Sequence, residues 1–274
     1  MGFLQGVTEL FPISSLGHSV VLPKLFGWNI DQKDPFFLTF IVLTHLATAA
    51  VLFFFFWKDW KRIITGVIRS LKEREIKDND AKLAWLLIIA TIPAGILGLL
   101  LEDRLKTLFA FPRLVAFILI LNGLMLLFAD FLRRKKAETT EEGSDQRIAK
   151  IGFSNAIKVG ALQALALIPG FSRTGSTITG GLLIGLSHED SARFAFLLAT
   201  PIIGAAAFLK LLELGISSDK NNIGPLLVGT ICSAVAAFLS IRFLTKYFET
   251  KKLTPFAIYC IVVGITLSAL FLQG

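Results

Sequence analysis

Ionisable and hydroxyl side chains gather in two short segments of an otherwise apolar sequence. The first segment holds Glu9, Ser15 and His18, and the second holds Arg173 among serines and threonines. Charged groups are costly within an apolar segment, so they mark a functional site by default. A carboxylate, an imidazole, hydroxyls and a guanidinium suit phosphate chemistry, in which a cation holds the phosphate and a base moves a proton.

The second segment, Pro169–Thr177, is expected to end one helix and begin another. Small residues let its backbone approach a ligand, and the N–H groups that open the next helix face an anion. Arg173 supplies a planar fork that suits phosphate oxygens. A plain helix break would explain the hydroxyls as caps, but it explains poorly an arginine in a long uncharged stretch. The candidate phosphate-binding residues are Ser172, Arg173, Thr174, Gly175, Ser176 and Thr177.

The first segment supplies acid–base groups. A carboxylate at Glu9 makes sense beside phosphates when a divalent cation bridges them. His18 can carry a proton near neutral pH, and a serine can attack phosphorus when a base takes its proton. The alternative for His18 is a buried ring bonded to a backbone carbonyl, but its neighbours favour a catalytic role. Either Ser15 attacks with His18 as base, or His18 activates water. Gln5 lies four residues before Glu9 on the same helix face. The candidate residues of this segment are Gln5, Glu9, Ser14, Ser15 and His18.

Three further ionisable residues lie outside these segments. His45 falls within a predicted span, where bonding across helices and support of the site are equally favoured. His188 follows Ser187 in a pattern typical of a helix cap, so we expect a structural role. Asp130 lies near the end of a span, and we expect it to pair with the basic cluster Arg133–Lys136.

The elements that carry these residues are predicted to be membrane helices. The 274 residues are 54% hydrophobic and 18% charged, whereas soluble domains carry about a quarter charged residues. Six apolar stretches approach the roughly 20 residues that a spanning helix needs, or do so once flanking residues snorkel. These spans are residues 35–57, 83–101, 114–132, 190–212, 222–242 and 254–273. The expected fold class is therefore an all-α polytopic membrane protein.

The net charge of +8 could suggest a nucleic-acid partner, but the basic residues lie between the apolar runs. Contact with anionic lipid headgroups explains that distribution better, so we expect membrane lipids and no nucleic acid. The two cysteines, Cys232 and Cys260, lie inside apolar spans. They indicate neither a disulfide framework nor a metal site.

Two apolar stretches, residues 3–25 and 155–186, are broken by proline, glycine and polar residues. Broken backbone cannot face lipid, so both are predicted to be re-entrant helix–loop–helix hairpins. A gapless alignment of Leu4-Gln5 on Leu162-Gln163 places Ser14 on Ser172. This similarity predicts two repeats, 1–132 and 154–274, joined by a cytoplasmic linker at 133–153. Each repeat contains one hairpin and three spans.

Charge in the loops predicts the orientation. Loops 58–82, 133–153 and 243–254 carry seventeen Lys and Arg residues, whereas the alternate loops carry five. The richer set should be cytoplasmic. Because each half has an odd number of spans, the second half is inverted, and the hairpin tips should meet near the midplane. We expect the site to open to the outer side.

Both polar segments carry a family resemblance. Leu4–His18 (LQGVTELFPISSLGH) resembles the N-terminal signature of bacterial undecaprenyl-diphosphatases of the bacitracin-resistance type, with its (E/Q)xxxE element at Gln5 and Glu9. Pro169–Thr177 (PGFSRTGST) resembles that family's PGxSRSxxT signature. The similarity extends over essentially the whole chain, including the closing PFAIY at Pro255–Tyr259.

The resemblance implies hydrolysis of undecaprenyl diphosphate to undecaprenyl phosphate and inorganic phosphate, in the bacterial cytoplasmic membrane, to recycle the carrier of cell-wall polymers. It implies that Glu9, with Gln5 as a further candidate, holds Mg²⁺ or Ca²⁺. It places Ser15 and His18 in the catalytic group and Arg173 on the phosphate. Gln5 stands where many members have glutamate, which weakens a two-carboxylate metal site. Thr174 replaces the usual serine and keeps the hydroxyl.

The resemblance also implies roughly ten further apolar residues before Gln5, so we expect either a misassigned start or a short first helix. The alternative function is a transporter or flippase of the phosphorylated carrier, because inverted repeats and broken helices are typical of transporters. The Glu, Ser, His and Arg set exceeds what binding requires and favours the enzyme. The expected partner is a polyprenyl diphosphate lipid, and a homodimer is left open.

Overall fold

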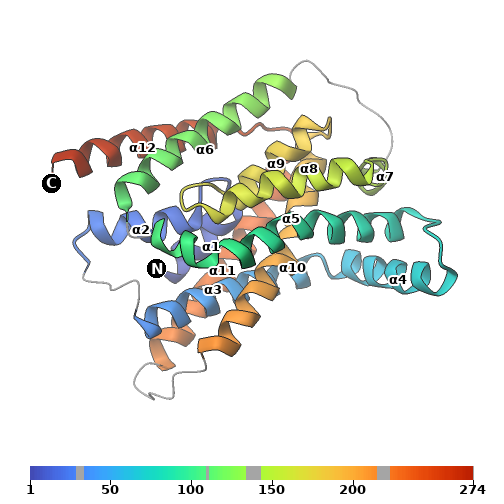
Figure 1. Cartoon of the computed structure of the whole chain (residues 1–274), viewed down its shortest axis with the longest axis horizontal. Helices are drawn as coiled ribbons and strands as arrows, with labels where there is room; N and C mark the ends of the chain where they lie inside the picture. Colours follow the sequence, from blue (N-terminus) through green and yellow to red (C-terminus); the bar gives the residue numbers. More distant parts are fainter. Residues whose placement is uncertain (29–33, 109–110, 134–142, 215–222, 274) are drawn as a thin grey trace.

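The computed structural model describes residues 1–28, 34–108, 111–133, 143–214 and 223–273. In these residues every regular element is a helix, and six helices are long and apolar enough to cross a membrane. The six are α3 (Pro35–Phe55), α5 (Asn79–Leu108), α6 (Pro112–Arg133), α10 (His188–Leu214), α11 (Ile223–Phe248) and α12 (Thr254–Gln273). They coincide with the six predicted spans, and the all-α polytopic fold is confirmed. Figure 1 shows α6 and α12 side by side along one edge.

The spanning helices begin and continue as their sequences dictate. Pro35 occupies the first turn of α3, where its missing N–H costs nothing, and the Asp34 side chain caps that turn by accepting from the Phe36 N–H. Pro93 and Pro201 lie inside α5 and α10 without ending them. Lipid offers no partner to the freed backbone groups, so neighbouring helices must satisfy them.

The segment predicted as the cytoplasmic loop 58–82 contains a helix, α4 (Trp57–Glu73). One face of α4 buries Ile63, Gly66 and Ser70, and the helix packs against α5. Its basic residues lie mainly on the exposed remainder of the surface. The high charge of this segment favoured a loop in the sequence analysis, although the apolar stripe of α4 stabilises a helix.

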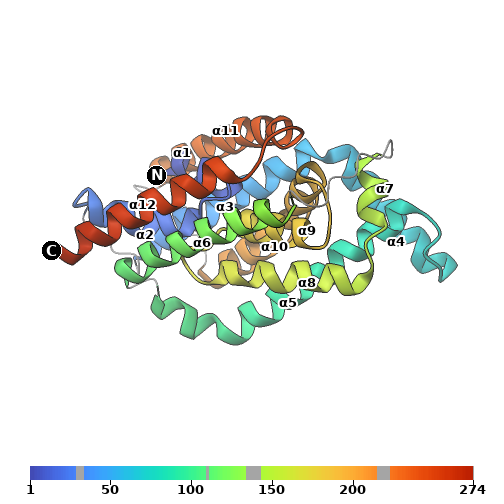
Figure 2. The ribbon, with the colours of Figure 1, turned by 90° about the horizontal axis from the view of Figure 1, so that it is seen from above.

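The predicted linker at 133–153 falls partly on residues 134–142, which lie outside the described residues. Its described remainder contains the short helix α7 (Ser144–Ala149). Figure 2 shows α4 and α7 together at one end of the molecule. Arg193 of α10 donates to Asp145 of α7 (2.8 Å) and to Asp59 of α4 (2.8 Å), and Arg62 also donates to Asp145. Burial alone would raise the pKa of Asp145, but the two guanidinium groups lower it below its usual value. The ionised carboxylate therefore ties α4, α7 and α10 together.

Asp130 is predicted to pair with the basic cluster Arg133–Lys136, of which residues 134–136 lie outside the described residues, and the partners that the structure describes are different ones. The buried carboxylate accepts from the His188 ring (2.7 Å) and from the Thr254 hydroxyl (2.7 Å). It also accepts from the backbone N–H groups of Leu253 and Thr254, which open α12. A helix N-terminus has free N–H groups and positive potential, so it attracts a carboxylate on the buried face of α6. The predicted cap before α10 is confirmed, since Ser187 accepts from the Asp190 N–H (3.0 Å).

The two segments predicted to be re-entrant hairpins each consist of helices separated by a break, and their re-entry into the membrane stays a prediction. The first consists of α1 (Gly2–Leu10) and α2 (Ser15–Leu25). The second consists of α8 (Phe153–Gln163), the 3₁₀ turn η1 (Ala164–Leu167) and α9 (Arg173–Leu183). Each hairpin packs against a span of the other half, α1 against α11 and α8 against α5. This reciprocal packing of each hairpin on the other half is compatible with the predicted two-fold repeat, which stays a prediction.

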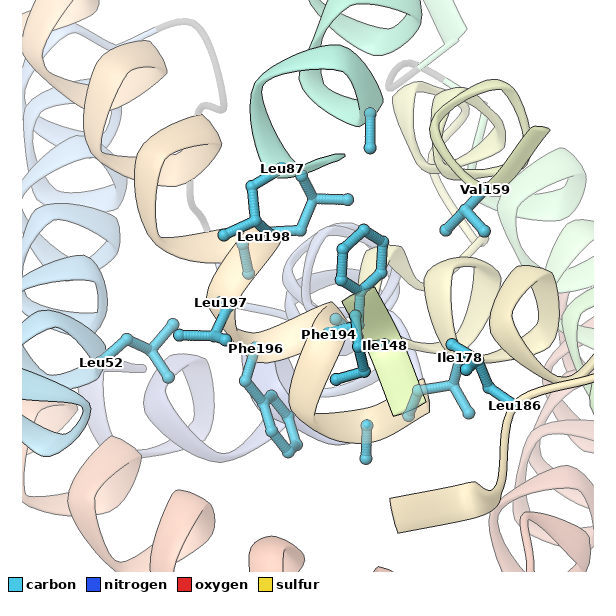
Figure 3. Packing of buried hydrophobic residues seen from close by; sticks show 14 of the residues in the cluster. Leu52, Leu87, Ile148, Val159, Ile178, Leu186, Phe194, Phe196, Leu197 and Leu198 are labelled. Carbon is cyan, nitrogen blue, oxygen red and sulfur yellow. The ribbon is translucent and has the colours of Figure 1, made fainter. Parts of the chain in front are cut away.

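The apolar core lies around α10, as Figure 3 shows. Phe194 and Phe196 of α10 are fully buried, and so are Ile178 of α9 and Val159 of α8. Leu52 of α3 and Ile148 of α7 belong to the same cluster. Leu10 of α1 belongs to the same cluster, so a helix of each hairpin is held against a rigid interior.

The α1–α11 contact depends on glycine. A methyl group at Gly6 would overlap the carbonyl oxygen of Ser233 and crowd Ala236, whereas one at Gly95 of α5 would meet nothing within 4 Å. We predict that Gly6→Ala lowers the free energy of unfolding by about 1–3 kcal/mol through overpacking. Gly95→Ala should instead stabilise its helix by about 0.5–1 kcal/mol. Thermal unfolding in detergent measures both, and equal shifts would contradict the close packing.

Candidate active site

The tips of the two hairpins meet in the interior. The Ser172 hydroxyl donates to the carbonyl oxygen of Phe11 (3.3 Å), and the Thr174 hydroxyl donates to the carbonyl oxygen of Glu9 (3.2 Å). A Cβ at Gly17 would lie 3.3 Å from the Cα of Gly170, so the two backbones nearly touch there. The predicted convergence of the two segments is thus present in the fold.

At both breaks a serine side chain caps the helix that follows. Ser14 accepts from the Gly17 N–H (3.1 Å) and caps α2, and Ser172 accepts from the Gly175 N–H (3.1 Å) and caps α9. The chain turns sharply at the first cap and just before the second, with φ of 70° at the capping residue Ser14 and 109° at Gly170, two residues before Ser172. A positive φ is unusual for serine and costs about 1–3 kcal/mol, so the surroundings must hold it. Both serines, predicted to bind substrate, therefore also shape the loops.

Asn122 of α6 joins the two tips. It is fully buried, its amide nitrogen donates to the Pro12 carbonyl (3.1 Å), and its amide oxygen accepts from the Ser172 N–H (3.0 Å). These two backbone groups are freed by the breaks in the hairpins and would otherwise lie unpaired in an apolar interior. One side chain therefore sets the spacing between the tips.

Glu9 is the centre of the site. Its Oε1 accepts from Arg173 Nη1 (3.0 Å), and its Oε2 accepts from Gln5 Nε2 (3.0 Å) and from the Ser15 hydroxyl. The side chain is only 3% exposed, whereas that of Arg173 is 21% exposed. A buried carboxylate is tolerated because a guanidinium and two further donors surround it.

His45 of α3 is part of this group. Its Nδ1–H donates to the Ile41 carbonyl (2.8 Å), and this orientation places Nε2 at 3.2 Å from Glu9 Oε2 and at 3.2 Å from the Gln5 amide nitrogen. Nε2 either donates to the carboxylate or accepts from the amide, depending on whether it carries a proton. Sequence reasoning favoured helix bonding and site support equally for this residue. The contact with Glu9 favours site support, because it anchors the carboxylate to a spanning helix.

His18 lies differently from the predicted base. Its Nδ1–H donates to the Ser14 carbonyl (2.7 Å), and its Nε2 accepts from the Tyr259 hydroxyl (2.8 Å). The two rings stack with centroids 5.8 Å apart. The Ser15 hydroxyl donates to Glu9 in this structure, so Glu9 stands where its proton would go. A catalytic role of His18 stays a prediction.

Two hollows meet at Arg173. A small polar pocket is lined by Glu9, Ser14, Ser15, Leu16, Ala166, Phe171, Ser172 and Arg173. A larger cavity of about 510 Å³ lies between α3, α5 and α10. His45, Gln163 and Arg173 are polar residues in its wall, most other lining residues are apolar, and Lys210 and Glu213 line it near the end of α10. Arg173 and Ala166 line both hollows. The polar pocket has a volume of only about 10 Å³ in this structure, so the arrangement places anion-binding groups beside an apolar cavity that can hold a chain.

Comparison with known proteins identifies the family. The family model described as "Bacitracin resistance protein BacA" matches residues 1–266. The chain is 47% identical to the undecaprenyl-diphosphatase of Mycolicibacterium paratuberculosis over 284 residues, covering 96% of this chain and 93% of that protein. It is 45% identical to the undecaprenyl-diphosphatase 2 of Chromobacterium violaceum over 266 residues, covering 96% and 93%.

The chain belongs to the BacA family. The resemblance read from its two polar segments is confirmed.

Sequence reasoning did not assign a site role to several residues that shape this BacA site. Asn122 gave no signal beyond a polar group inside an apolar span, and Tyr259 was noted only as the last residue of the PFAIY segment. Gln163 had a signal, since the repeat aligns it with Gln5. The other predicted phosphate-binding residues lie on the first turns of α9. The Thr177 hydroxyl donates to the Arg173 carbonyl (2.9 Å).

The donor set offers one carboxylate for a metal. In the part of the chain that the structure describes, no group of three or more His, Cys, Asp or Glu side chains could hold a metal ion. Glu9 with Gln5 is a sparse set, but Mg²⁺ is often held by one or two carboxylates together with water and substrate phosphates. These residues therefore fit a cation that arrives with a phosphorylated substrate.

The link through Asn122 can be tested by removing it. We predict that Asn122→Leu lowers the free energy of unfolding by about 1–3 kcal/mol, because the Ser172 N–H and the Pro12 carbonyl lose their partner. Asn155→Leu serves as the control, since its amide oxygen accepts only an exposed bond from Lys158 (3.4 Å). Thermal unfolding in detergent compares the two, and equal midpoints would show that Asn122 does not hold the tips.

Proposed function

We propose that this chain hydrolyses undecaprenyl diphosphate to undecaprenyl phosphate and inorganic phosphate, and so recycles the lipid carrier of cell-wall polymers. The observation that carries the proposal is the convergence of Arg173, Glu9 and Ser15 at a polar pocket beside an apolar cavity of about 510 Å³. A polyprenyl diphosphate has an anionic head and an apolar tail in the same arrangement. The undecaprenyl-diphosphatases to which the chain is similar support the same substrate.

Arg173 binds the diphosphate, assisted by the opening of α9. The Arg173 side chain borders both hollows, so its fork can reach phosphate oxygens in either. The first N–H groups of α9 add positive potential at the same place. Ser172, Thr174, Ser176 and Thr177 supply hydroxyl groups around that turn.

The bond that breaks joins the terminal phosphorus to the bridging oxygen. In one route the Ser15 oxygen attacks that phosphorus while Glu9 or His18 takes its proton, and undecaprenyl phosphate leaves. Water then releases inorganic phosphate from the serine. In the other route a base, His18 among the candidates, activates water for direct attack. The hydrogen bond from Ser15 to Glu9 supports Glu9 as the acceptor in the first route.

A divalent cation, Mg²⁺ or Ca²⁺, completes the proposed site. Glu9 would hold it, with Gln5 as the further candidate, and the cation would neutralise charge on the phosphate oxygens. Arg173 would neutralise the remaining negative charge of the phosphate groups. Because Glu9 also pairs with Arg173 (3.0 Å), cation and guanidinium act on the same carboxylate.

The site is proposed to open to the outer side of the bacterial cytoplasmic membrane. The large cavity runs along α10 from Pro201 to Lys210 and Glu213, near the end of that helix. The loop 214–224 follows, and it belongs to the set poor in lysine and arginine. Because positive charge favours the cytoplasmic side, this end of the cavity should face outward.

Phosphate release from undecaprenyl diphosphate by the purified protein in detergent tests the function. We predict that Arg173→Ala lowers kcat/KM by about 10²–10³-fold, as the loss of one transition-state donor typically does. Arg173→Lys should fall between it and wild type, since charge remains but the fork is lost. The exposed Arg242→Ala serves as control.

The same phosphate-release assay identifies the group that attacks the terminal phosphorus. If Ser15 attacks, Ser15→Ala should lose activity and a phosphorylated Ser15 should be trapped by acid quenching. Full activity in Ser15→Ala would exclude that route. Lipid movement across vesicles without any phosphate release by wild type would favour a transporter and contradict the hydrolase.

Metal dependence is a separate prediction. EDTA should abolish phosphate release, and Mg²⁺ or Ca²⁺ should restore it. Glu9→Gln should raise the cation concentration needed for half-maximal activity, because one ligand charge is lost. Unchanged turnover in EDTA would remove the cation from the mechanism.

A further inference from the structure

We propose that the large cavity opens sideways into the bilayer between α5 and α10, and that Gly95 and Gly98 of α5 keep this opening wide enough for a polyprenyl chain. The opening makes the site selective for substrates with a long chain. The proposal rests on the proposed function. It assigns a specificity-determining role to two glycines that lie outside both signature segments.

Helix packing does not explain these two glycines, although both line the cavity. Among the residues that the structure describes, a methyl group at Gly95 would meet nothing within 4 Å, and one at Gly98 would meet only Leu167 at 3.5 Å. By contrast, a methyl group at Gly160 of α8 would lie 2.2 Å from the carbonyl oxygen of Ala90 in α5. Glycine inside a helix costs about 0.5–1 kcal/mol relative to alanine. Close packing offsets that cost at Gly160 but not at the two glycines of the cavity wall.

The cavity meets lipid between α5 and α10. Ala205 and Ala206 of α10 line it and are exposed, as is Gly95 of α5. Leu99 and Leu209 also line it, and they are 73% and 57% exposed. Both helices are long and apolar enough to cross the membrane, so side chains exposed on these stretches face acyl chains. Small side chains on both helices therefore border an apolar opening that continues from the cavity into the bilayer.

The cavity has a different character near the end of α10. Lys210 and Glu213 line it there and form an ion pair of 2.6 Å. An apolar chain that passed this pair would remove water from both charges, which is unfavourable. The tail therefore leaves through the apolar opening between α5 and α10.

The size of the cavity requires such an opening. A volume of about 510 Å³ is typical of a pocket for a drug-sized ligand. The undecaprenyl chain is far longer than a ligand of that size, so only its part next to the diphosphate fits inside, and the remainder extends into lipid. A bulky side chain at the opening should obstruct a long chain and spare a short chain that ends inside the cavity.

Phosphate release by the protein in lipid vesicles tests this difference. The two substrates are undecaprenyl diphosphate and geranyl diphosphate, which carries the same head on a short chain. Gly95→Phe and Gly98→Phe should each lower kcat/KM for undecaprenyl diphosphate by about tenfold or more, mainly by raising KM, because the ring fills the opening. The value for geranyl diphosphate should stay close to that of wild type. Gly95→Ala should change neither value, since its methyl group meets nothing.

Ile96→Phe and Leu100→Phe are the matched controls. They place the same ring at neighbouring positions of α5, where the side chains are 52% and 75% exposed and are not among those that line the cavity. Both should keep the wild-type ratio of the two kcat/KM values. If Gly98→Phe fails to fold because of its contact with Leu167, Gly95→Phe carries the test.

Two outcomes of Gly95→Phe would overturn the proposal. An equal loss of kcat/KM for both substrates would mean that the ring disturbs the whole site, and an unchanged value for undecaprenyl diphosphate would mean that the chain does not pass there. Binding of undecaprenyl phosphate and geranyl phosphate, measured without turnover, tests the opening even if wild type releases no phosphate. Gly95→Phe should then weaken only the longer lipid, so failure of the opening is distinguished from failure of the proposed function.

Discussion

The ion pair between Glu9 and Arg173 joins two hairpins that are separated by most of the chain, and it does so in an interior from which water is largely excluded. Burial of either charge alone would be strongly unfavourable. The pair therefore fixes the first hairpin against the second and sets the place at which their tips meet. In the proposed reaction a phosphate bound to Arg173 becomes a second partner of that guanidinium. The Glu9–Arg173 pair that joins the hairpins therefore also positions the guanidinium to bind an anion.

The breaks in the hairpins are needed for this geometry. An unbroken helix would carry its polar groups along its side, whereas a break directs the first N–H groups of α2 and α9 into the interior. Free backbone groups are tolerated only where protein satisfies them. Asn122, Ser172 and Thr174 do so with bonds of 3.0–3.3 Å across the two tips. The loops that expose backbone to a ligand are thus held rigidly by these side chains.

The two hollows differ in polarity, and this difference sets the orientation of a bound amphiphile. The polar pocket has charged and hydroxyl walls, and the cavity beside it is lined chiefly by aliphatic side chains of α3, α5 and α10. An amphiphile can be placed in only one way in such a space, because a charged head is strongly disfavoured between apolar walls. At the other end of the protein, the ion pairs among α4, α7 and α10 link three helices outside the apolar region. These pairs hold the end of α10 that leads into the core.

The sequence by itself determined the spans, the positions of both breaks and the chemical types in the site. Each of these follows from local composition: apolar runs cross a membrane, Pro12 and Pro169 end helices, and Glu9 and Arg173 are costly unless they act. The sequence also carried the family signatures. It missed α4, because basic residues concealed an apolar stripe.

Only the tertiary structure decided which groups face one another. His18 contacts Tyr259, which lies 241 residues away, while Ser15 donates to Glu9. Asp130 meets the His188 ring and the start of α12. Such pairings depend on how helices pack across the bilayer, and spacing along the chain carries no information about distances between helices that are far apart in sequence.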